Sequence, residues 1–375
     1  MLAIGLMSGT SLDGIDVCLV EIKKTDKFIY TIKAFESFPY SDELVKKIKD
    51  VSNINTSNVQ KICSLNVEIS YAYVDAINKL LSLYNIEKKE IEFIAMHGQT
   101  IWHNPDNMDG YTSSTLQIGD PSVVAYAFNK KVISNFRMMD MAAGGCGAPL
   151  IPFVDYLLYS STEKSIAMQN IGGIGNVCYM KKGTTIDNVV AFDTGPGNMM
   201  IDEAMSILFD KPYDESGNVA KSGKIDPKVL NYLLDDEYLK RPYPKSTGRE
   251  KYNTSFVNDV INKVLDNGGS KEDVISTLTA FTAYSIIDAY NNYLDDIDEV
   301  IVSGGGSHNE FIMNILKENL KANVIVETKT DAFEAYGFAI LGHMTLLNKP
   351  SNVPVVTNAK RRVVLGNITT PPYEE

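Results

Sequence analysis

A series of elements occurs twice in this chain of 375 residues, and the repetition limits the folds available to it. Each copy has three short strand-like runs, then a helix, then another buried strand-like run. Each copy also has a Gly-rich turn between its first two strands, SGTSLDG in one and NIGGIGN in the other. Tight turns join antiparallel strands, whereas a helical crossover joins parallel ones. The pattern therefore predicts an α/β chain with two mixed sheets.

The expected elements follow from apolar alternation and helical spacing. One long helix begins at Ser57, where SNVQ has the form of a capping box. In the first copy we expect strands at Leu2–Ser8, Ile15–Ile22, Phe28–Ser37 and Ile91–Met96, with a short helix at Asp42–Asp50. In the second copy we expect strands at Ser165–Ile171, Val177–Met180, Asn188–Phe192, Glu299–Val302 and Asn323–Val326, with helices at Asn198–Phe209, Val274–Leu294 and Asn309–Leu320.

Two such copies predict two lobes. We expect the first lobe at residues 1–134 and the second at 135–351, with the tail 352–375 packing back on the first. Facing lobes would bring both Gly-rich turns to a shared active-site cleft. Clefts of this kind are preferred places for ligands.

Charge and hydropathy exclude several classes of function. The formal net charge is -12, which argues against nucleic-acid binding because that rests on basic surfaces. No apolar run is long enough for a membrane span, and no signal peptide opens the chain, so we expect a cytoplasmic protein. The four cysteines are widely spaced without a CxxC pattern. They indicate reduced thiols and no structural zinc site.

The first Gly-rich turn lies in GLMSGTSLDG, residues 5–14. Its backbone N–H groups are suited to phosphate oxygens, and Asp13 or Asp16 is suited to a hydrated divalent cation. The alternative is an ordinary hairpin turn.

A second loop, FDTGPGN, runs from a strand end at Asp193 to a helix start near Asn198. A strand, a glycine loop and a helix N-terminus together favour an anion, through free N–H groups and the helix dipole. Asp193 would point into the cleft. The alternative makes Asp193 a plain cap of the following turn.

A third loop, VSGGGSHN, carries Gly304, Gly305 and Gly306 between a strand and a helix. Three glycines allow a flat group such as adenine or ribose to approach the backbone, although a flexible connection is the alternative. The chain contains no P-loop pattern and no nucleophile elbow, and a dinucleotide-binding reading is weak.

Two further loops suit a sugar. MHGQTIWHNP presents His97, Gln99, Thr100 and His103 as neutral donors and acceptors beside Trp102. The alternative is a polar loop satisfied within the protein.

FRMMDMAAGGCGAPLIP places Arg137 and Asp140 before a Gly/Ala-rich hinge, and Arg137 is suited to clamp a carboxylate or hydroxyls. RPYPKSTGREKY, residues Arg241–Tyr252, is a basic island in an acidic chain. It either faces an anionic group or is a solvated loop against the acidic segment before it.

Together these strings resemble the anhydro-N-acetylmuramic acid kinases, which belong to the actin, Hsp70 and sugar-kinase superfamily. The resemblance runs nearly end to end and rests on nine strings in order. They are GLMSGTSLDGID, MHGQT, LQIGD, FR..D.AAGG.GAPLIP, NIGGIGN, FDTGPGNMMID, RPYPKSTGRE, SGGGSHN and DAFEAYGFA. It implies two lobes, each a ribonuclease H-like βββαβα unit with a mixed sheet.

The resemblance also implies a reaction. Water attacks the anomeric carbon of a 1,6-anhydrosugar, the C1–O6 bond opens, and O6 accepts the γ-phosphoryl group of ATP. The product is N-acetylmuramic acid 6-phosphate, in cell-wall recycling. The family's general base corresponds to Asp193. Mg²⁺ as cofactor, with Asp13 holding it through water, and a homodimer are further implications.

The implied site residues fall into two groups. The nucleotide side comprises Gly9, Thr10, Ser11, Leu12, Asp13, Gly14, Ile15, Asp16, Gly173, Gly195, Gly197, Asn198, Gly304, Gly305 and Gly306. The sugar side comprises His97, Gln99, Thr100, Arg137, Asp140 and Glu334, with Glu334 a candidate to stabilise oxocarbenium-like charge.

Three positions depart from the family pattern: Cys146 replaces the usual glutamine, Gly175 a commoner alanine, and Tyr252 the usual phenylalanine. Because Cys146 lies in a loop suited to the sugar side, it bears on acceptor choice. A kinase of another anhydrosugar such as levoglucosan is therefore one alternative. A non-catalytic, actin-like nucleotide switch is another.

Overall fold

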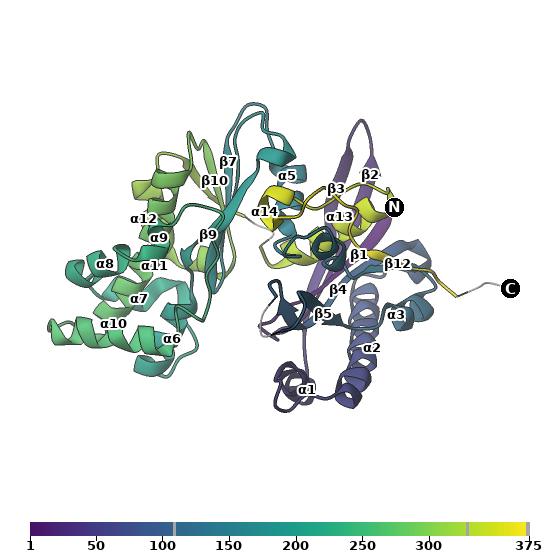
Figure 1. Ribbon diagram of the computed structural model, residues 1–375, viewed down its shortest axis with the longest axis horizontal. Helices are drawn as coiled ribbons and strands as arrows, with labels where there is room; N and C mark the ends of the chain where they lie inside the picture. The colour runs from purple at the N-terminus through teal and green to yellow at the C-terminus, as the bar shows by residue number, and fades with distance from the viewer. Residues whose placement is uncertain (108–109, 328–329, 373–375) are drawn as a thin grey trace. The chain divides into compact units, whose positions relative to one another are not determined.

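The computed structural model describes residues 1–107, 110–327 and 330–372. The chain forms two compact units (Figure 1). Unit 1 comprises Met1–Val154 with Asp331–Glu375, and unit 2 comprises Asp155–Thr330. Among the described helices, none combines the length and the apolar character that crossing a membrane requires.

Unit 1 is built on a seven-stranded mixed sheet of order β12-β6-β4-β1-β2-β3, with β5 paired to β4. Tight connections make β1, β2 and β3 antiparallel, whereas β4 returns parallel to β1 after the long helix α2. The strands are β1 Leu2–Ser8, β2 Gly14–Lys24, β3 Phe28–Pro39, β4 Ile91–Asn104, β5 Ser114–Ile118, β6 Lys131–Ser134 and β12 Asn367–Thr369. The helices are α1 Asp42–Ser52, α2 Val59–Leu83, α3 Pro121–Phe128, α4 Met138–Ala142, α5 Ile151–Tyr159 (which runs on into unit 2), α13 Phe333–Leu346 and α14 Pro354–Thr357.

Unit 2 repeats this plan with a five-stranded sheet of order β11-β10-β7-β8-β9. Its first three strands are antiparallel, and β10 and β11 are parallel to β7 and to each other. The strands are β7 Ile166–Ile171, β8 Ile174–Met180, β9 Val190–Pro196, β10 Glu299–Ser303 and β11 Asn323–Val326. The helices are α6 Met199–Phe209, α7 Asn218–Ser222, α8 Pro227–Leu234, α9 Glu237–Lys240, α10 Thr254–Asp266, α11 Lys271–Tyr293 and α12 Glu310–Asn319.

The duplication predicted from the sequence is confirmed. In both units the third, second and first strands of the meander are followed in the sheet by two parallel strands. The same strand order with the same directions is the ribonuclease H-like arrangement. The two-lobed α/β fold class therefore holds, while the expected cleft depends on how the units are placed and stays a prediction.

Each sheet is covered by one long helix whose apolar face is buried. In unit 1, Ile69, Tyr73 and Ile77 of α2 are fully buried. On β1, a Cβ added to Gly5 would lie 1.9 Å from the carbonyl oxygen of Ala335, so α13 packs against this strand at backbone distance. In unit 2, α11 is buried on nearly every side. A helix that is buried on nearly every side belongs inside a core.

Several boundaries differ from those expected. Helix α2 is capped by Asn58, whose side chain accepts the N–H of Lys61, so the capping box at Ser57 is wrong. Strand β4 continues past His97 because its second half pairs with β5.

The expected lobe boundaries also differ from the division into units. The division falls inside α5 and before α13, because α13 packs on β1. In the tail, β12 pairs with β6 of unit 1, and residues 373–375 lie outside the described residues.

Candidate functional site

The turn between β1 and β2 is closed by a hydrogen bond of 3.3 Å from the N–H of Leu12 to the carbonyl of Gly9. Leu12 adopts φ 63°, in the left-handed region. A Cβ on Gly14 would lie 2.4 Å from the carbonyl oxygen of Phe38, so only glycine fits there. Within the described part of the chain, the N–H groups of Thr10 and Ser11 donate no hydrogen bond. The turn thus keeps free donors for an anion.

Carboxylates gather beside this turn. Asp13 is exposed and Asp16 is half-buried. Partial burial raises the pKa of Asp16, a hydrogen bond with Ser37 opposes that rise, and the charges of Asp331 and Asp13 add to it. The described residues contain no group of three or more metal-ligating side chains. Mg²⁺ usually takes one or two carboxylates with substrate phosphates and water, and Asp13 and Asp16 fit that requirement.

His97 and Arg137 form a rigid pair in unit 1. The Nε–H of Arg137 donates to Nε2 of His97 over 2.9 Å, and Nδ1 of His97 lies 2.7 Å from the carbonyl oxygen of Gly98. Since arginine only donates, His97 is neutral with its proton on Nδ1. Burial, and then the charge of Arg137, lower the pKa of His97 well below its usual value. Burial also lowers the pKa of Arg137 to about 10, opposed by Glu334.

Two residues expected on the sugar side are instead satisfied inside the protein. Gln99 is fully buried, accepts the hydroxyl of Tyr40 and donates to the carbonyl of Gly9 over 3.1 Å. Gln99 therefore supports the first Gly-rich turn. Whether a local polar side chain faces ligand or protein depends on neighbours that are distant in sequence.

Asp140 is also fully buried. Its oxygens accept the N–H of Gly147 at 2.9 Å and, at 2.8 Å each, the side chains of Asn352 and Thr357. These hydrogen bonds fix the loop that contains Cys146. Both oxygens of Asp140 are thus engaged within unit 1, and its place on the sugar side stays a prediction.

Glu334 keeps its side chain exposed at the start of α13. Desolvation by the surrounding protein raises the pKa of Glu334, the charge of Arg137 opposes that rise, and the charge of Asp16 adds to it. Glu334 is therefore linked electrostatically to both the sugar-side pair and the acidic turn.

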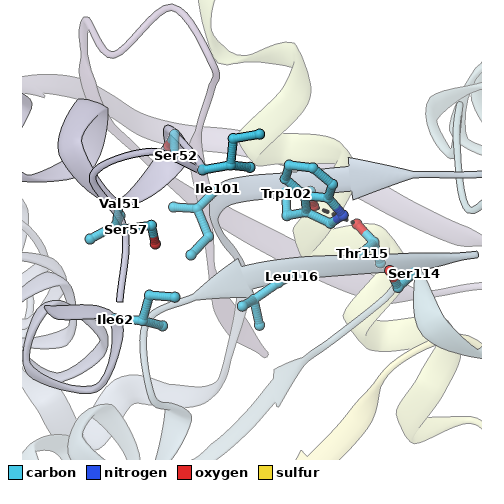
Figure 2. Close-up of a pocket in the computed structure, with 10 residues that line it drawn as sticks. Val51, Ser52, Ser57, Ile62, Ile101, Trp102, Ser114, Thr115 and Leu116 are labelled. Carbon is cyan, nitrogen blue, oxygen red and sulfur yellow. Dashed lines mark hydrogen bonds between the residues drawn. The ribbon is translucent and has the colours of Figure 1, made fainter. Parts of the chain in front are cut away.

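Two neighbouring cavities of about 450 Å³ each open beside these elements. Figure 2 shows the first, between the α1–α2 connection and the β4–β5 hairpin, with Trp102 at one side and Ile62 at the other. The second shares Ser52, Ile101 and Trp102 with the first. It reaches further residues from three elements, namely Thr10, Leu12, Lys49, Asn53, Thr100 and His103.

The second cavity therefore joins part of the first Gly-rich turn to strand β4, where sugar-side residues were expected. Thr10 comes from the turn, and Thr100 and His103 come from β4. Trp102 is 42% exposed, so its ring offers an apolar face. Lys49 adds a positive charge that the sequence patterns did not single out. No short motif marks Lys49, because its approach to the turn depends on how α1 packs.

In unit 2, Asp193 lies on β9 and is held by a loop distant in sequence. Its Oδ2 accepts the N–H of Thr247 at 3.0 Å, and its carbonyl oxygen accepts the hydroxyl of Tyr238 at 2.8 Å. Burial raises the pKa of Asp193 to about 6, the Thr247 N–H opposes the rise, and Glu250 adds to it. Within the described residues, Oδ1 has no hydrogen bond.

The glycine loops of unit 2 pack on one another. The N–H groups of Gly197, Asn198 and Met199 donate to the carbonyls of Gly173 and Gly172 over 2.8–3.2 Å. The expected free donors at the start of α6 are therefore already used at these three positions. Anion binding by the backbone at these three positions would require those hydrogen bonds to the β7–β8 turn to break, and the nucleotide-side assignment of Gly197 and Asn198 stays a prediction.

The remaining glycines divide into packed and open positions. Gly195 has φ 145° and lies against Ser285, and Gly304 and Gly306 pack on Ile171 so closely that a Cβ would clash. A Cβ on Gly173 or Gly305 would instead meet nothing nearer than 3.8 Å and 3.4 Å. Backbone approach by a ligand is therefore possible at the open positions, Gly173 and Gly305.

Comparisons with known proteins agree over nearly the whole chain. A family model described as anhydro-N-acetylmuramic acid kinase matches residues 1–371. The anhydro-N-acetylmuramic acid kinase of Francisella tularensis subsp. novicida is 44% identical and is covered over 97% of each chain. That of Bacillus cereus is 44% identical over 99% of this chain and 97% of its own. Among solved structures, (R)-2-hydroxyglutaryl-CoA dehydratase component A of Acidaminococcus fermentans aligns with TM-score 0.48 at 12% identity, covering 91% of this chain and 96% of its own.

Proposed function

The chain belongs to the anhydro-N-acetylmuramic acid kinase family, and we propose that it hydrolytically opens the 1,6-anhydro ring of anhydro-N-acetylmuramic acid and phosphorylates O6 at the expense of ATP. The product would be N-acetylmuramic acid 6-phosphate, as in cell-wall recycling. Asp193 is the single feature that carries this proposal. Asp193 offers a buried carboxylate with one oxygen fixed by the Thr247 N–H and the other free to accept a proton from water.

The proposed chemistry begins with water. Oδ1 of Asp193 accepts a proton as the water oxygen bonds to C1, and the C1–O6 bond breaks. O6 leaves as an alkoxide, attacks the γ-phosphorus and displaces ADP, so no second proton is needed at O6. A carboxylate with a pKa of about 6 is mostly ionised at pH 7 and still basic enough to accept the proton. A positioned base contributes roughly 10²–10⁴-fold to such a step.

The nucleotide phosphates are assigned to the turn in unit 1, and the open glycines of unit 2 are separate candidates for nucleotide contact. Thr10 and Ser11 have free N–H groups, and Gly173 and Gly305 allow backbone approach. Asp13 and Asp16 would hold Mg²⁺, directly or through water, and the ion would neutralise charge on the transferring phosphoryl group. This assignment also accounts for the negative charges of Asp331 and Asp13, which add to the rise that burial causes in the pKa of Asp16.

The second cavity of unit 1 supports the acidic amino sugar, rather than levoglucosan, as the acceptor. Its lining places Lys49 near Thr10, Thr100 and the exposed ring of Trp102. A cation and a ring face suit a sugar that carries a carboxylate and acyl groups. Levoglucosan has neither a carboxylate nor an acyl group. Arg137, held by His97 and Gly147, provides a further fixed cation on this unit.

One assay tests the proposal. ADP release is measured by a coupled enzyme with anhydro-N-acetylmuramic acid, with levoglucosan and with no sugar, and products are weighed by mass spectrometry. We expect sugar-dependent ADP release and a product heavier by one water and one phosphoryl group. Faster turnover of levoglucosan would reject the acceptor, and ADP release indifferent to either sugar would reject the kinase assignment to this substrate class. Cytoplasmic location and homodimerisation stay predictions.

A further inference from the structure

The loop Arg241–Tyr252 contains a lysine that is enclosed by aromatic rings. Nζ of Lys245 donates to the carbonyls of Leu239 at 2.9 Å and Tyr238 at 3.3 Å. The same ammonium lies 4.6 Å from the ring centroid of Tyr293, 5.0 Å from Tyr238 and 5.6 Å from Phe192. Cations over aromatic faces at these distances are attracted to them, more strongly when desolvated.

The rings of this cage are themselves fixed. Tyr243 stacks on Phe192 with an interplanar angle of 9°, and the hydroxyl of Tyr293 donates to the carbonyl of Leu239 at 3.0 Å. The two carbonyls that Lys245 binds lie in the short helix α9, and that of Tyr238 also accepts the N–H of Arg241 at 3.1 Å. A cation at this end is favourable. Lys245 is therefore built into its position.

From the cage the loop runs directly to Asp193. The carbonyl of Lys245 accepts the N–H of Asp193 at 3.1 Å, and two residues later the N–H of Thr247 donates to Oδ2 of Asp193. Tyr238, whose carbonyl and ring hold the ammonium, donates its hydroxyl to the carbonyl of Asp193. The N–H, the carbonyl and one carboxylate oxygen of Asp193 thus all bond to the loop or to Tyr238.

We propose that Lys245 is a positioning residue for Asp193: its ammonium, bound in the aromatic cage, holds the loop against β9 so that the Thr247 N–H fixes one carboxylate oxygen and leaves the other free for water. The proposal rests on the proposed role of Asp193 as base. It gives the basic island in the sequence an internal function. The cation serves the protein's own catalytic carboxylate and does not face an anionic ligand.

The physical consequence is a change in the basicity of Asp193. A hydrogen bond to the charged form of a carboxylate stabilises that form. If the loop shifts enough to lose the Thr247 N–H while Asp193 stays buried, that hydrogen bond no longer opposes the rise in the pKa of Asp193 that burial causes. Near Asp193, the charged and titratable groups are Glu250 and Tyr238. Near Lys245, they are Asp288, Tyr238 and Tyr293.

The test compares Lys245→Met, which keeps the side chain's length, with Lys245→Arg, which keeps the charge. Lys240→Met is the matched control, because Lys240 is exposed and forms an ion pair with the exposed Asp235. For Lys245→Met we expect kcat to fall at least about 10-fold and the acid limb of kcat/KM to move to higher pH by about half a pH unit or more. Lys245→Arg should recover much of both, and Lys240→Met should match the wild type.

A second readout does not depend on turnover. Carboxyl ¹³C resonances of aspartate-labelled protein, with Asp193 assigned by loss of its signal in Asp193→Asn, report the pKa of Asp193. We expect it to be higher in Lys245→Met than in the wild type. This measurement stays informative if the wild type proves inactive on the sugar, so failure of the proposed function and failure of this inference are distinguishable.

Folding is checked by thermal melting. If Lys245→Met does not fold, Tyr293→Leu replaces it, since removing one wall of the cage should shift the Asp193 pKa in the same direction by a smaller amount. A folded Lys245→Met or Tyr293→Leu protein with an unchanged Asp193 pKa and an unchanged acid limb would overturn the proposal. A fall in kcat with no movement of either would show that the loop is only a structural support.

Discussion

Replacing Asp193 with asparagine should remove activity and increase stability in the same protein. Asparagine is nearly isosteric, and its carbonyl oxygen can still accept the Thr247 N–H that the structure places 3.0 Å from the carboxylate. The backbone bonds of position 193 to Lys245 and Tyr238 are unaffected by the side chain. The variant should therefore fold, bind nucleotide and keep the site's shape while lacking a base.

The loss of activity follows from the role of the carboxylate. Without a group to accept the proton of water, turnover should fall by roughly 10²–10⁴-fold. In the wild type, kcat/KM should follow the ionised fraction of Asp193, whose pKa is about 6. Activity at pH 5 should then be about one-tenth of the plateau value. The variant should show no acid limb at this pH.

The gain in stability follows from linkage. Burial raises the pKa of Asp193 in the folded protein to about 6, above the ordinary value of about 3.9 in an unfolded chain. Between these values the folded state binds the proton more tightly, so stability falls as pH rises through this window and the cost is constant above it. Without solvent screening, this pKa difference corresponds to a loss of roughly 3 kcal/mol in the free energy of unfolding, and screening reduces the loss to about 1–2 kcal/mol.

Urea unfolding at pH 4 and pH 7, with the coupled ADP assay, measures both effects. We expect the variant to exceed the wild type in stability by about 1–2 kcal/mol at pH 7 and to match it near pH 4. If the Asp193→Asn protein is less stable than the wild type at pH 7, the claim that burial of the ionised carboxylate costs stability is refuted. Turnover within about 10-fold of the wild type would refute its role as base.

Four further substitutions separate ligand contacts from structural supports. Lys49→Met should raise KM for anhydro-N-acetylmuramic acid several-fold and leave any turnover of levoglucosan unchanged, in initial-rate kinetics; an equal effect on both sugars would contradict carboxylate recognition. Gly197→Ala should lower the melting temperature, because its Cβ would lie 2.1 Å from the carbonyl oxygen of Gly172, whereas Gly173→Ala should melt within a few degrees of the wild type but bind nucleotide more weakly by calorimetry. Asp140→Ala should destabilise the fold by about 3 kcal/mol in urea, because three buried donors lose their acceptor; a stable variant with only a raised sugar KM would place Asp140 at the ligand instead.

The elements that the sequence predicted well are those whose signal is local. Each strand of the two meanders alternates or is continuously apolar, and each ends at glycine or a polar turn, so β1, β3, β7 and β11 lie where expected. The same locality explains the error at α2. Ser57 and Asn58 are both good caps, and which of them binds the third helical N–H depends on where the first turn packs.

Side-chain direction was predicted less well. Gln99 and His97 come from one polar motif on β4. The side chain of Gln99 is hydrogen-bonded to Tyr40 and Gly9, whereas His97 accepts a hydrogen bond from Arg137. Asp140 follows Arg137 closely and has the composition of a site residue, but its partners Asn352 and Thr357 come from the far end of the chain. A local pattern does not contain partners that are hundreds of residues away.

The sequence by itself determined the duplicated α/β plan and the positions of the Gly-rich turns, because apolar periodicity and turn-forming glycines are properties of neighbouring residues. It placed Asp193 at a strand end, which is wrong, because β9 continues through Asp193 to Pro196 in its pairing with β8. Only the tertiary structure decided what those residues do. It occupied the donors at the start of α6 with a neighbouring turn, put Lys49 in a cavity, and brought Lys245 and Thr247 to Asp193. These outcomes arise from the packing of segments that are distant in sequence, and such packing fixes direction, burial and pKa.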